Sequence, residues 1–211
     1  MRPHYQFWPR RLPKSITLPA TSLWDNLATN ARRYPDKAAL VFFGTTVSYR
    51  QLMEGAERLA ARLAQLGVQR GDRVVLCMQN CPQLVMAHFA ILRANAVVVP
   101  VNPMNRTDEL RHCQQDSGAT VAITAQHLLP EFAPLHQPDA PSEPVPGSML
   151  TAALRHLVVA TYSDALPTLP ALPEPPAPDL VAAPRQPLVG DRKSTRLNSS
   201  HAGLSRMPSS A

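Results

Sequence analysis

The stretch that decides the fold is Val74–Asn102, VVLCMQNCPQLVMAHFAILRANAVVVPVN. It begins with the apolar run Val74–Met78 and ends with a second apolar run, Val97–Val101, and both are rich in the β-branched residues typical of strands. Between them, Pro82 stands where a first helical residue is expected, and the segment after it is apolar almost all round, as in a buried helix. Strand, helix and strand in this order indicate one unit of a parallel sheet covered by helices on both faces.

The same alternation continues after Asn102. Thr107 is expected to cap a further helix, because acidic residues follow in its first turn, and Gly118 is expected to end it. A short apolar run comes next, and Leu154–Thr161 could add another strand. Strands that alternate with helices predict the α/β fold class, with a mostly parallel sheet over Val74–Thr124 and right-handed crossovers.

The N-terminal side adds a helix, a hairpin and a second helix. Thr21-Ser22 is expected to supply the N-cap of the first helix, and two β-rich runs around Gly44 predict a hairpin. Ser48 and Gln51 have the spacing of a capping box. The helix after them shows the clearest apolar face in the chain, and Gly67 is placed to end it.

Proline marks the limits of this alternating region. The chain has 211 residues and 23 prolines, and 14 of these prolines fall between Pro130 and Pro187. Leu166–Pro187 loses all periodicity, which predicts a Pro-rich linker at residues 162–190, and residues 1–19 predict an extended N-terminal arm. We therefore expect an incomplete layered domain at residues 20–161, followed by a Pro-rich, disordered C-terminal part.

Charge and hydropathy indicate which classes of partner, nucleic acid or membrane, the chain is expected to bind. The formal net charge is +6, but half of it comes from residues 191–211, and the basic residues form no stripe with interleaved aromatics. We therefore expect no nucleic-acid partner. No run approaches the ~20 apolar residues of a membrane span, and the N-terminus lacks the apolar core of a signal peptide. The sequence predicts a cytoplasmic protein without a transmembrane segment and leaves peripheral membrane contact open.

The segment Asp191–His201, DRKSTRLNSSH, has an unusual source. It matches the in-frame translation of a common short-read sequencing adaptor over its whole length. We therefore interpret residues 191–211 as adaptor-derived and disordered, and leave them out of the reasoning about the fold. The alternative is a genuine basic, Ser-rich tail.

Residues with reactive side chains are scattered along the chain. The three cysteines define no disulfide framework, and no His or Cys group has the spacing of a zinc site. His88 is better explained as a partly buried histidine with its hydrogen bonds made than as a catalytic base. His112 and Cys113 are adjacent in sequence, so on a helix their side chains point in different directions and do not form a nucleophile pair. Packing, turn or helix-end roles suit the remaining candidates: Trp24, Arg32, Arg33, Tyr49, Asp72, Arg73, Cys77 and Cys81. We assign no catalytic, cofactor-binding or metal-binding residue.

Residues 18–124 carry an ordered set of motifs that resembles the start of the adenylate-forming (AMP-binding) enzymes, the acyl-CoA synthetases in particular. Val47–Leu52, VSYRQL, is similar to the first core motif, L-[ST]-Y-x-E-L, with Val in place of Leu and Gln in place of Glu. Residues 67–74, GVQRGDRV, look like the G-V-x-x-G-D-x-V connection. Leu92–Asn102, LRANAVVVPVN, is similar to the second core motif, with Asn95 in place of the usual Gly. The opening Trp-Pro and Leu-Pro pairs are most similar to long-chain fatty acid–CoA ligases.

The resemblance implies a two-step reaction in the intact enzyme. ATP and a fatty or other carboxylic acid give an acyl-adenylate and pyrophosphate, and coenzyme A then takes the acyl group. The family performs this chemistry with a Gly-rich phosphate loop, with Mg and with a lysine on a C-terminal domain. No two of the eight glycines of this chain lie closer than four residues apart, so no segment has the form of that loop.

These observations lead to two hypotheses. The first is an N-terminal fragment of an ATP-dependent fatty acid–CoA ligase, inactive by itself and binding none of the family's cofactors. The alternative is a small α/β binding or interaction module with a Pro-rich tail.

Overall fold

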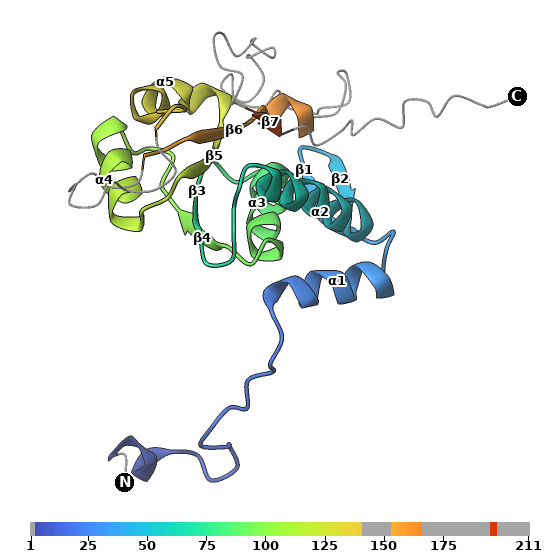
Figure 1. Cartoon of the computed structure of the whole chain (residues 1–211). Coiled ribbons are helices and arrows are strands. Elements are labelled where there is room, and N and C mark those ends of the chain that lie inside the picture. The colour runs from blue at the N-terminus through green and yellow to red at the C-terminus, as the bar shows by residue number, and fades with distance from the viewer. Residues whose placement is uncertain (1–2, 141–152, 166–194, 198–211) are drawn as a thin grey trace, which may run out of the picture.

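The computed structural model describes residues 3–140, 153–165 and 195–197. The predicted Pro-rich linker after residue 165 and most of the segment after residue 190 lie outside the described residues. Figure 1 shows a layered α/β body with the N-terminal segment reaching away from it. Within the described ranges, no helix is both long and apolar enough to cross a membrane.

A parallel sheet forms the centre of the body. Its strands are β3 (Arg73–Cys77), β4 (Val97–Pro100), β5 (Val121–Ala125), β6 (His156–Ala160) and β7 (Thr195–Leu197), in the spatial order β4-β3-β5-β6-β7. Every neighbouring pair is parallel. The prediction of an α/β fold with a mostly parallel sheet is therefore confirmed, and the strand expected at Leu154–Thr161 is β6.

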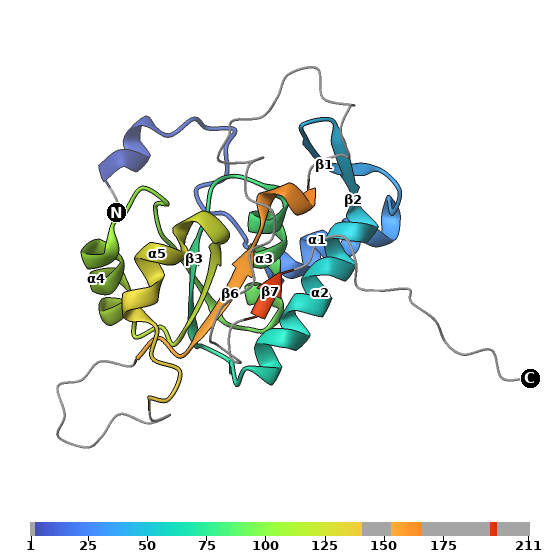
Figure 2. The ribbon, with the colours of Figure 1, turned by 90° about the horizontal axis from the view of Figure 1, so that it is seen from above.

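Helices cover both faces of this sheet. Figure 2 shows α4 (Thr107–Ser117) and α5 (Leu129–Phe132) on one side, and α3 (Pro82–Arg93) on the other. Short 3₁₀ turns join the elements: η2 (Gln126–Leu128), η3 (Ala133–Leu135) and η4 (Tyr162–Ala165). The helix beginning at Pro82 follows the sequence prediction, since Pro at the first helical position loses no backbone bond.

The N-terminal elements build a further layer on α3. They are α1 (Leu23–Arg33), the antiparallel pair β1 (Ala38–Phe42) and β2 (Thr45–Ser48), and α2 (Tyr49–Gln65). Ser22 caps α1 and Ser48 caps α2, each as half of a capping box, so both predicted caps are confirmed. Before them, the expected extended arm contains a 3₁₀ helix, η1 (Pro3–Phe7).

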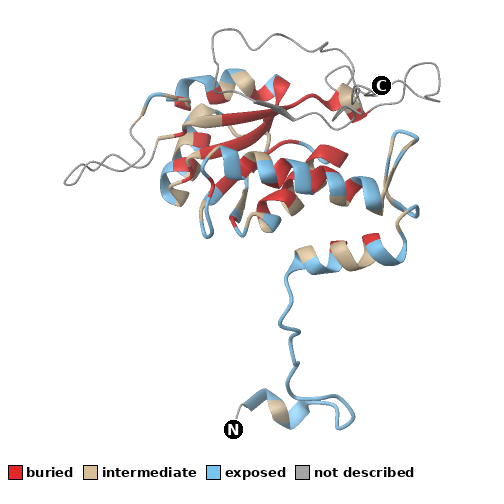
Figure 3. Ribbon diagram, turned by 45° about the vertical axis from the view of Figure 1, so that its right-hand side comes forward, coloured by how far each residue is buried: buried red, intermediate tan, exposed pale blue. Residues whose placement is uncertain are grey.

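The core lies between the sheet and the helix faces turned toward it, coloured red in Figure 3. Strands β5 and β6 are buried almost throughout, as expected of parallel strands covered on both faces. Strand β4 differs, because it stands at the edge of the sheet, and its Val97 is 47% exposed.

Helices α2 and α3 pack closely where α2 carries a glycine. A Cβ added at Gly55 would lie 2.5 Å from Cε and 2.8 Å from Sδ of Met86, which is itself buried. Because Gly55 has no side chain, the end of the Met86 side chain can pack directly against the backbone of α2. Since protein interiors are close-packed, this pair fixes the separation of the two helices.

Asn95 lies in the turn between α3 and β4, where the second core motif usually has Gly. Its φ is 56°, in the left-handed region that favours glycine. Asn is one of the few other residues that adopts this conformation readily. The departure from the motif therefore keeps the same backbone conformation.

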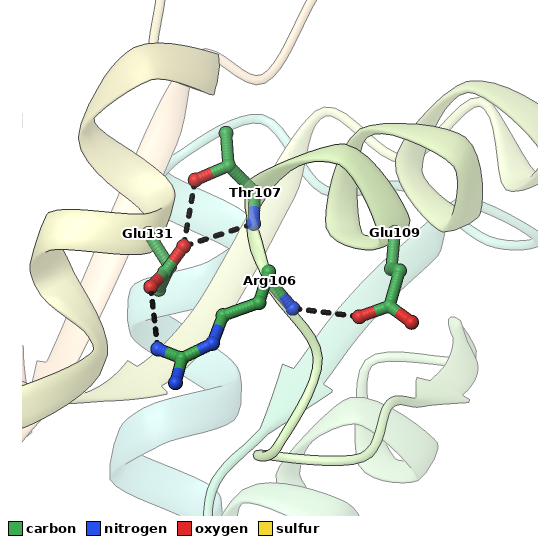
Figure 4. A network of polar contacts seen from close by, with 4 residues as sticks. All are labelled: Arg106, Thr107, Glu109 and Glu131. Carbon is green, nitrogen blue, oxygen red and sulfur yellow. Dashed lines mark hydrogen bonds and ion pairs between the residues drawn. The ribbon is translucent and has the colours of Figure 1, made fainter.

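The start of α4 differs from the prediction. Arg106, and not Thr107, is the N-cap, and the Arg106 N–H donates to Oε2 of Glu109 at 2.8 Å. Thr107 is instead bound by a residue far away in sequence: its N–H and its hydroxyl both donate to Glu131 on α5, at 2.9 and 2.7 Å (Figure 4). Arg106 completes this network with an ion pair to Glu131 at 3.0 Å. Gly118 ends the helix in the left-handed conformation, as predicted.

Strand β7 lies in the segment interpreted as adaptor-derived. Residues Thr195–Leu197 pair in parallel with β6, so these three residues differ from the expected disorder. The other residues of 191–211 lie outside the described residues.

Candidate functional site

The chain reverses its direction of travel across the sheet at β3. From β3 it passes through α3 to β4 on one side, and from β4 it passes through α4 to β5 on the other side of β3. Open α/β sheets bind their ligands beyond the carboxyl ends of the strands at such a reversal. The carboxyl ends of β3 and β5, together with the neighbouring end of β6, are therefore the candidate site.

Polar residues collect at this edge although it is buried. Thr124, at the end of β5, donates its hydroxyl to the carbonyl of Cys77 at the end of β3, at 3.0 Å. After β6, the Tyr162 hydroxyl accepts from the N–H of Gln79 at 2.7 Å. Both bonds join the ends of different strands, so they hold this edge together without any charged group.

Gln83, in the first turn of α3, is fully buried and completes the edge. Its Nε2 donates to the carbonyl of Thr161 at 3.0 Å, and the Thr161 hydroxyl donates to Oε1 of Gln126 at 3.3 Å. The Oε1 of Gln83 has no hydrogen-bond partner within the described ranges. A buried acceptor without a partner costs about 1–3 kcal/mol, so this residue is not explained by stability alone. We name Gln83, Thr124, Gln126, Thr161 and Tyr162 the carboxyl-edge cluster.

The five residues of the cluster carry amide, hydroxyl and phenol groups, and none of them is charged at neutral pH. Burial is the main cause that raises the pKa of Tyr162 above its ordinary value, so the phenol keeps its proton. Burial likewise raises the pKa of the Cys77 thiol to about 12 and that of Cys81 to about 11. These thiols are not nucleophiles at neutral pH, because the thiolate is the reactive form. This edge can orient a polar group, but these residues offer neither a general base nor a cation for a phosphate.

Cys77 and Cys81 have structural roles. Both are buried, as expected of small hydrophobic residues. Cys81 is also the N-cap of α3, and its Sγ accepts from the N–H of Leu84 at 3.4 Å.

The histidines and the third cysteine considered from the sequence do not come together with the cluster. His88 is half-buried on α3, and its ring contacts that of Phe89 edge to face. On α4, His112 is exposed and Cys113 half-buried. These placements suit the structural roles considered from the sequence.

The charged and aromatic candidates lie in turns and between helices. Asp72 accepts from the N–H of Gln69 at 2.8 Å within a turn, and Arg73 donates to the carbonyl of Ser117 at 2.6 Å. The guanidinium of Arg93 lies over the ring of Trp24. Tyr49 begins α2, and Arg32 and Arg33 end α1. Among the described residues, no three or more His, Cys, Asp or Glu side chains gather closely enough to hold a metal ion.

Polar residues that follow apolar runs are the sequence signal for the carboxyl-edge cluster. Gln126 directly follows the run of β5, and Thr161 directly follows that of β6. The side chain of Gln83 reaches the carbonyl of Thr161 only because β3 and β6 lie on either side of β5. The order of the strands was needed to bring them together.

The sequence of this chain matches a known protein family. The family model described as AMP-binding enzyme matches residues 27–185. The chain belongs to this family, and the resemblance read from its motifs is confirmed.

Several relatives of known sequence are long-chain-fatty-acid–CoA ligases. The chain is 35% identical over 130 residues to a long-chain-fatty-acid–CoA ligase of Bacillus subtilis, a match that covers 62% of this chain and 23% of that protein. It is 46% identical over 99 residues to a long-chain-fatty-acid–CoA ligase of Salmonella typhimurium, covering 46% of this chain and 18% of that protein. The match thus spans about a fifth of the length of these relatives.

Solved structures agree with this assignment. The anthranilate CoA ligase AuaEII, in complex with anthranoyl-AMP, is similar with a TM-score of 0.57 and 25% identity, over 67% of this chain and 25% of that one. The N-terminal domain of FACL13 from Mycobacterium tuberculosis is similar with a TM-score of 0.52 and 27% identity, over 58% of this chain and 31% of that one. The parallel sheet and its helices are therefore an arrangement found in CoA ligases.

Proposed function

We propose that this chain is the N-terminal part of an ATP-dependent fatty acid–CoA ligase. The observation that carries the proposal is the 46% identity to the Salmonella typhimurium long-chain-fatty-acid–CoA ligase. The Bacillus subtilis relative has the same name and shares 35% of the aligned residues. The substrate is then a fatty or other carboxylic acid, and ATP, Mg and coenzyme A take part in the reaction of the intact enzyme.

The described residues provide a scaffold for this reaction. The carboxyl-edge cluster is neutral, with Tyr162 kept protonated by burial. Formation of an acyl-adenylate develops charge on pyrophosphate, which requires preorganised donors and cations. We therefore infer that these residues support the active site of the intact enzyme and that this chain alone, which has no Gly-rich phosphate loop in its sequence, catalyses neither step.

The division of the chain follows from the same proposal. Residues 1–19 are an arm, and residues 20–161 are part of the AMP-binding domain. The linker expected at residues 162–190 begins only after η4, because Tyr162 and Ala165 are buried. Residues 191–211 are adaptor-derived. Resequencing the genomic locus tests the last assignment: codons for DRKSTRLNSSH at that position would contradict it. A fluorescent fusion expressed in cells tests the proposed cytoplasmic location of the enzyme.

Fatty-acid-dependent exchange of labelled pyrophosphate into ATP tests the activity. The purified chain is expected to show no exchange above the background without fatty acid. A longer protein, extended with the sequence that the genomic locus encodes after Gly190, is expected to show exchange that depends on a fatty acid. The matched control is the same extended protein assayed with an amino acid in place of the fatty acid.

The inactivity of this chain and the fatty-acid substrate of the intact enzyme are contradicted by different results. Exchange by the purified chain would show that the absent phosphate loop is not needed. An extended protein that is active only with amino acids would retain the family and overturn the substrate class.

A further inference from the structure

The N-terminal segment folds on itself apart from the body. Tyr5 donates its hydroxyl to the carbonyl of Lys14 at 3.0 Å, and Trp8 donates its indole N–H to the carbonyl of Leu12 at 3.3 Å. The Lys14 ammonium lies 5.4 Å from the centroid of the Tyr5 ring. We name residues 3–18, which comprise this fold and the strand-like segment after it, the N-terminal hook. Figure 1 shows that it extends away from the sheet and its covering helices.

The hook exposes large apolar side chains. Phe7 is 87% exposed and Ile16 83%, and Leu12 and Leu18 are also exposed. Single exposed apolar residues are common, and the feature of this segment is that four large ones lie within twelve residues of sequence.

The charged side chains of the hook are all basic. Residues 1–24 contain four basic side chains, Arg2, Arg10, Arg11 and Lys14, and no acidic one before Asp25. Arg10, Arg11 and Lys14 are exposed. The same short segment therefore presents cations beside apolar and aromatic side chains.

We propose that the N-terminal hook binds the surface of a membrane that contains anionic lipid. Aromatic and aliphatic side chains enter the boundary between head groups and acyl chains, while Arg and Lys stay at the level of the lipid phosphates. Negative lipids attract each such cation. An anionic bilayer supplies both an apolar layer and negative charge, which together match this surface. The placement of the hook lets it reach a bilayer without rearrangement of the sheet.

Co-sedimentation of the full chain with lipid vesicles tests this proposal. Vesicles of equal parts phosphatidylglycerol and phosphatidylcholine are expected to bind the chain, and vesicles of phosphatidylcholine alone are expected to bind it about tenfold or more weakly. Binding is expected to weaken as salt rises, because the Debye length shortens to about 3 Å at 1 M. Equal binding to both kinds of vesicle would overturn the proposal.

Two variants separate charge from apolar insertion. The triple change Arg10→Gln, Arg11→Gln and Lys14→Gln is expected to weaken binding about a hundredfold, from about fivefold for each cation. Its matched control removes three exposed arginines of the body, Arg32→Gln, Arg33→Gln and Arg70→Gln, and is expected to bind as the unchanged chain does.

The second variant is Phe7→Ser with Ile16→Ser, expected to weaken binding about tenfold or more. Its control changes two exposed apolar residues of the body, Val41→Ser and Met104→Ser. All variants alter exposed side chains, and circular dichroism checks that each is folded. Equal losses in a variant and its control would show that overall charge or hydropathy, and not the hook, causes binding. No binding of the unchanged chain would indicate that another protein surface covers the hook, and would overturn the proposal.

Discussion

Helices α2 and α4 begin in different ways. At α2 the Ser48 N–H donates to Oε1 of Gln51 at 2.8 Å, and the Gln51 N–H donates to Oγ of Ser48 at 3.2 Å, so both partners lie within three residues. At α4 the backbone and hydroxyl of Thr107 donate to Glu131, which is 24 residues away on another helix. The first start is encoded locally and can form with its own helix. The second requires that α4 and α5 are already packed together.

The largest expected effect concerns the buried face of α2. Leu63 is fully buried, and Leu63→Ala is expected to lower the free energy of unfolding by about 3 kcal/mol, because it removes apolar contacts and leaves a cavity. Urea unfolding followed by circular dichroism measures it. Glu57→Ala, at an exposed position of the same helix, is the control and should change the free energy by less than about 0.5 kcal/mol. Equal losses in the two variants would mean that α2 is not packed as described.

The remote cap of α4 is expected to have the next largest effect. Glu131→Ala removes both bonds to Thr107 and the ion pair with Arg106. Amide hydrogen exchange in the first turn of α4 should become faster, and the melting temperature should fall by more than in Ser48→Ala. Exchange in α2 serves as the internal control and should not change. If α4 kept its protection, the network in Figure 4 would not determine the start of this helix.

The local cap of α2 is expected to contribute less. Ser48→Ala should lower the free energy of unfolding by about 1 kcal/mol, as is typical for the loss of an N-cap side chain. Ser48→Asn should restore most of it, since Asn caps as well as Ser does. A Ser48→Asn variant as unstable as Ser48→Ala would indicate that packing at this position, and not capping, is responsible.

The smallest expected effect is a pH dependence at the start of α4. Hydrogen bonds from Thr107, followed by that from Arg106, lower the pKa of Glu131 from its ordinary value of 4.5. A carboxylate whose pKa is lower in the folded state stabilises the fold above its unfolded pKa, and this contribution is lost as pH falls through the folded value. Protection of α4 amides should therefore decrease below pH 4.5.

The control for this pH dependence is Glu131→Gln, which cannot titrate. Its α4 amides should show a flatter dependence of protection on pH over the same range. The pKa of Asp25 is also lowered, by hydrogen bonds from Ser22, so α1 should lose protection in the same way in both proteins. If the two proteins lost α4 protection in parallel, another group would be responsible.

The contrast between the two helices also explains how much the sequence could predict. Ser48, Pro82 and Gly118 act within a few residues of their own position, and the elements they begin or end were predicted correctly. Glu131 acts across the fold, so the wrong cap was predicted for α4. The edge position of β4 depends on the strand order, which periodicity along the chain does not contain.

The candidate site illustrates the same limit. Gln83 and Thr161 are 78 residues apart and meet only through the order of the strands. Their side chains are neutral amides and hydroxyls, which carry no motif of catalysis or metal binding. The family, in contrast, could be predicted from motifs, because the order and spacing of short segments survive substitutions such as Asn95 for Gly.

The contact between Gly55 and Met86 has a consequence for the evolution of this domain. Since a Cβ at residue 55 would lie 2.5 Å from the Met86 methyl group, the two positions cannot both carry large side chains at this helix separation. Homologues with alanine or a larger residue at the first position should carry a shorter or differently directed side chain at the second. The two positions are therefore expected to co-vary, although the flexible thioether end of Met86 can make room for a small side chain such as alanine by changing its rotamer.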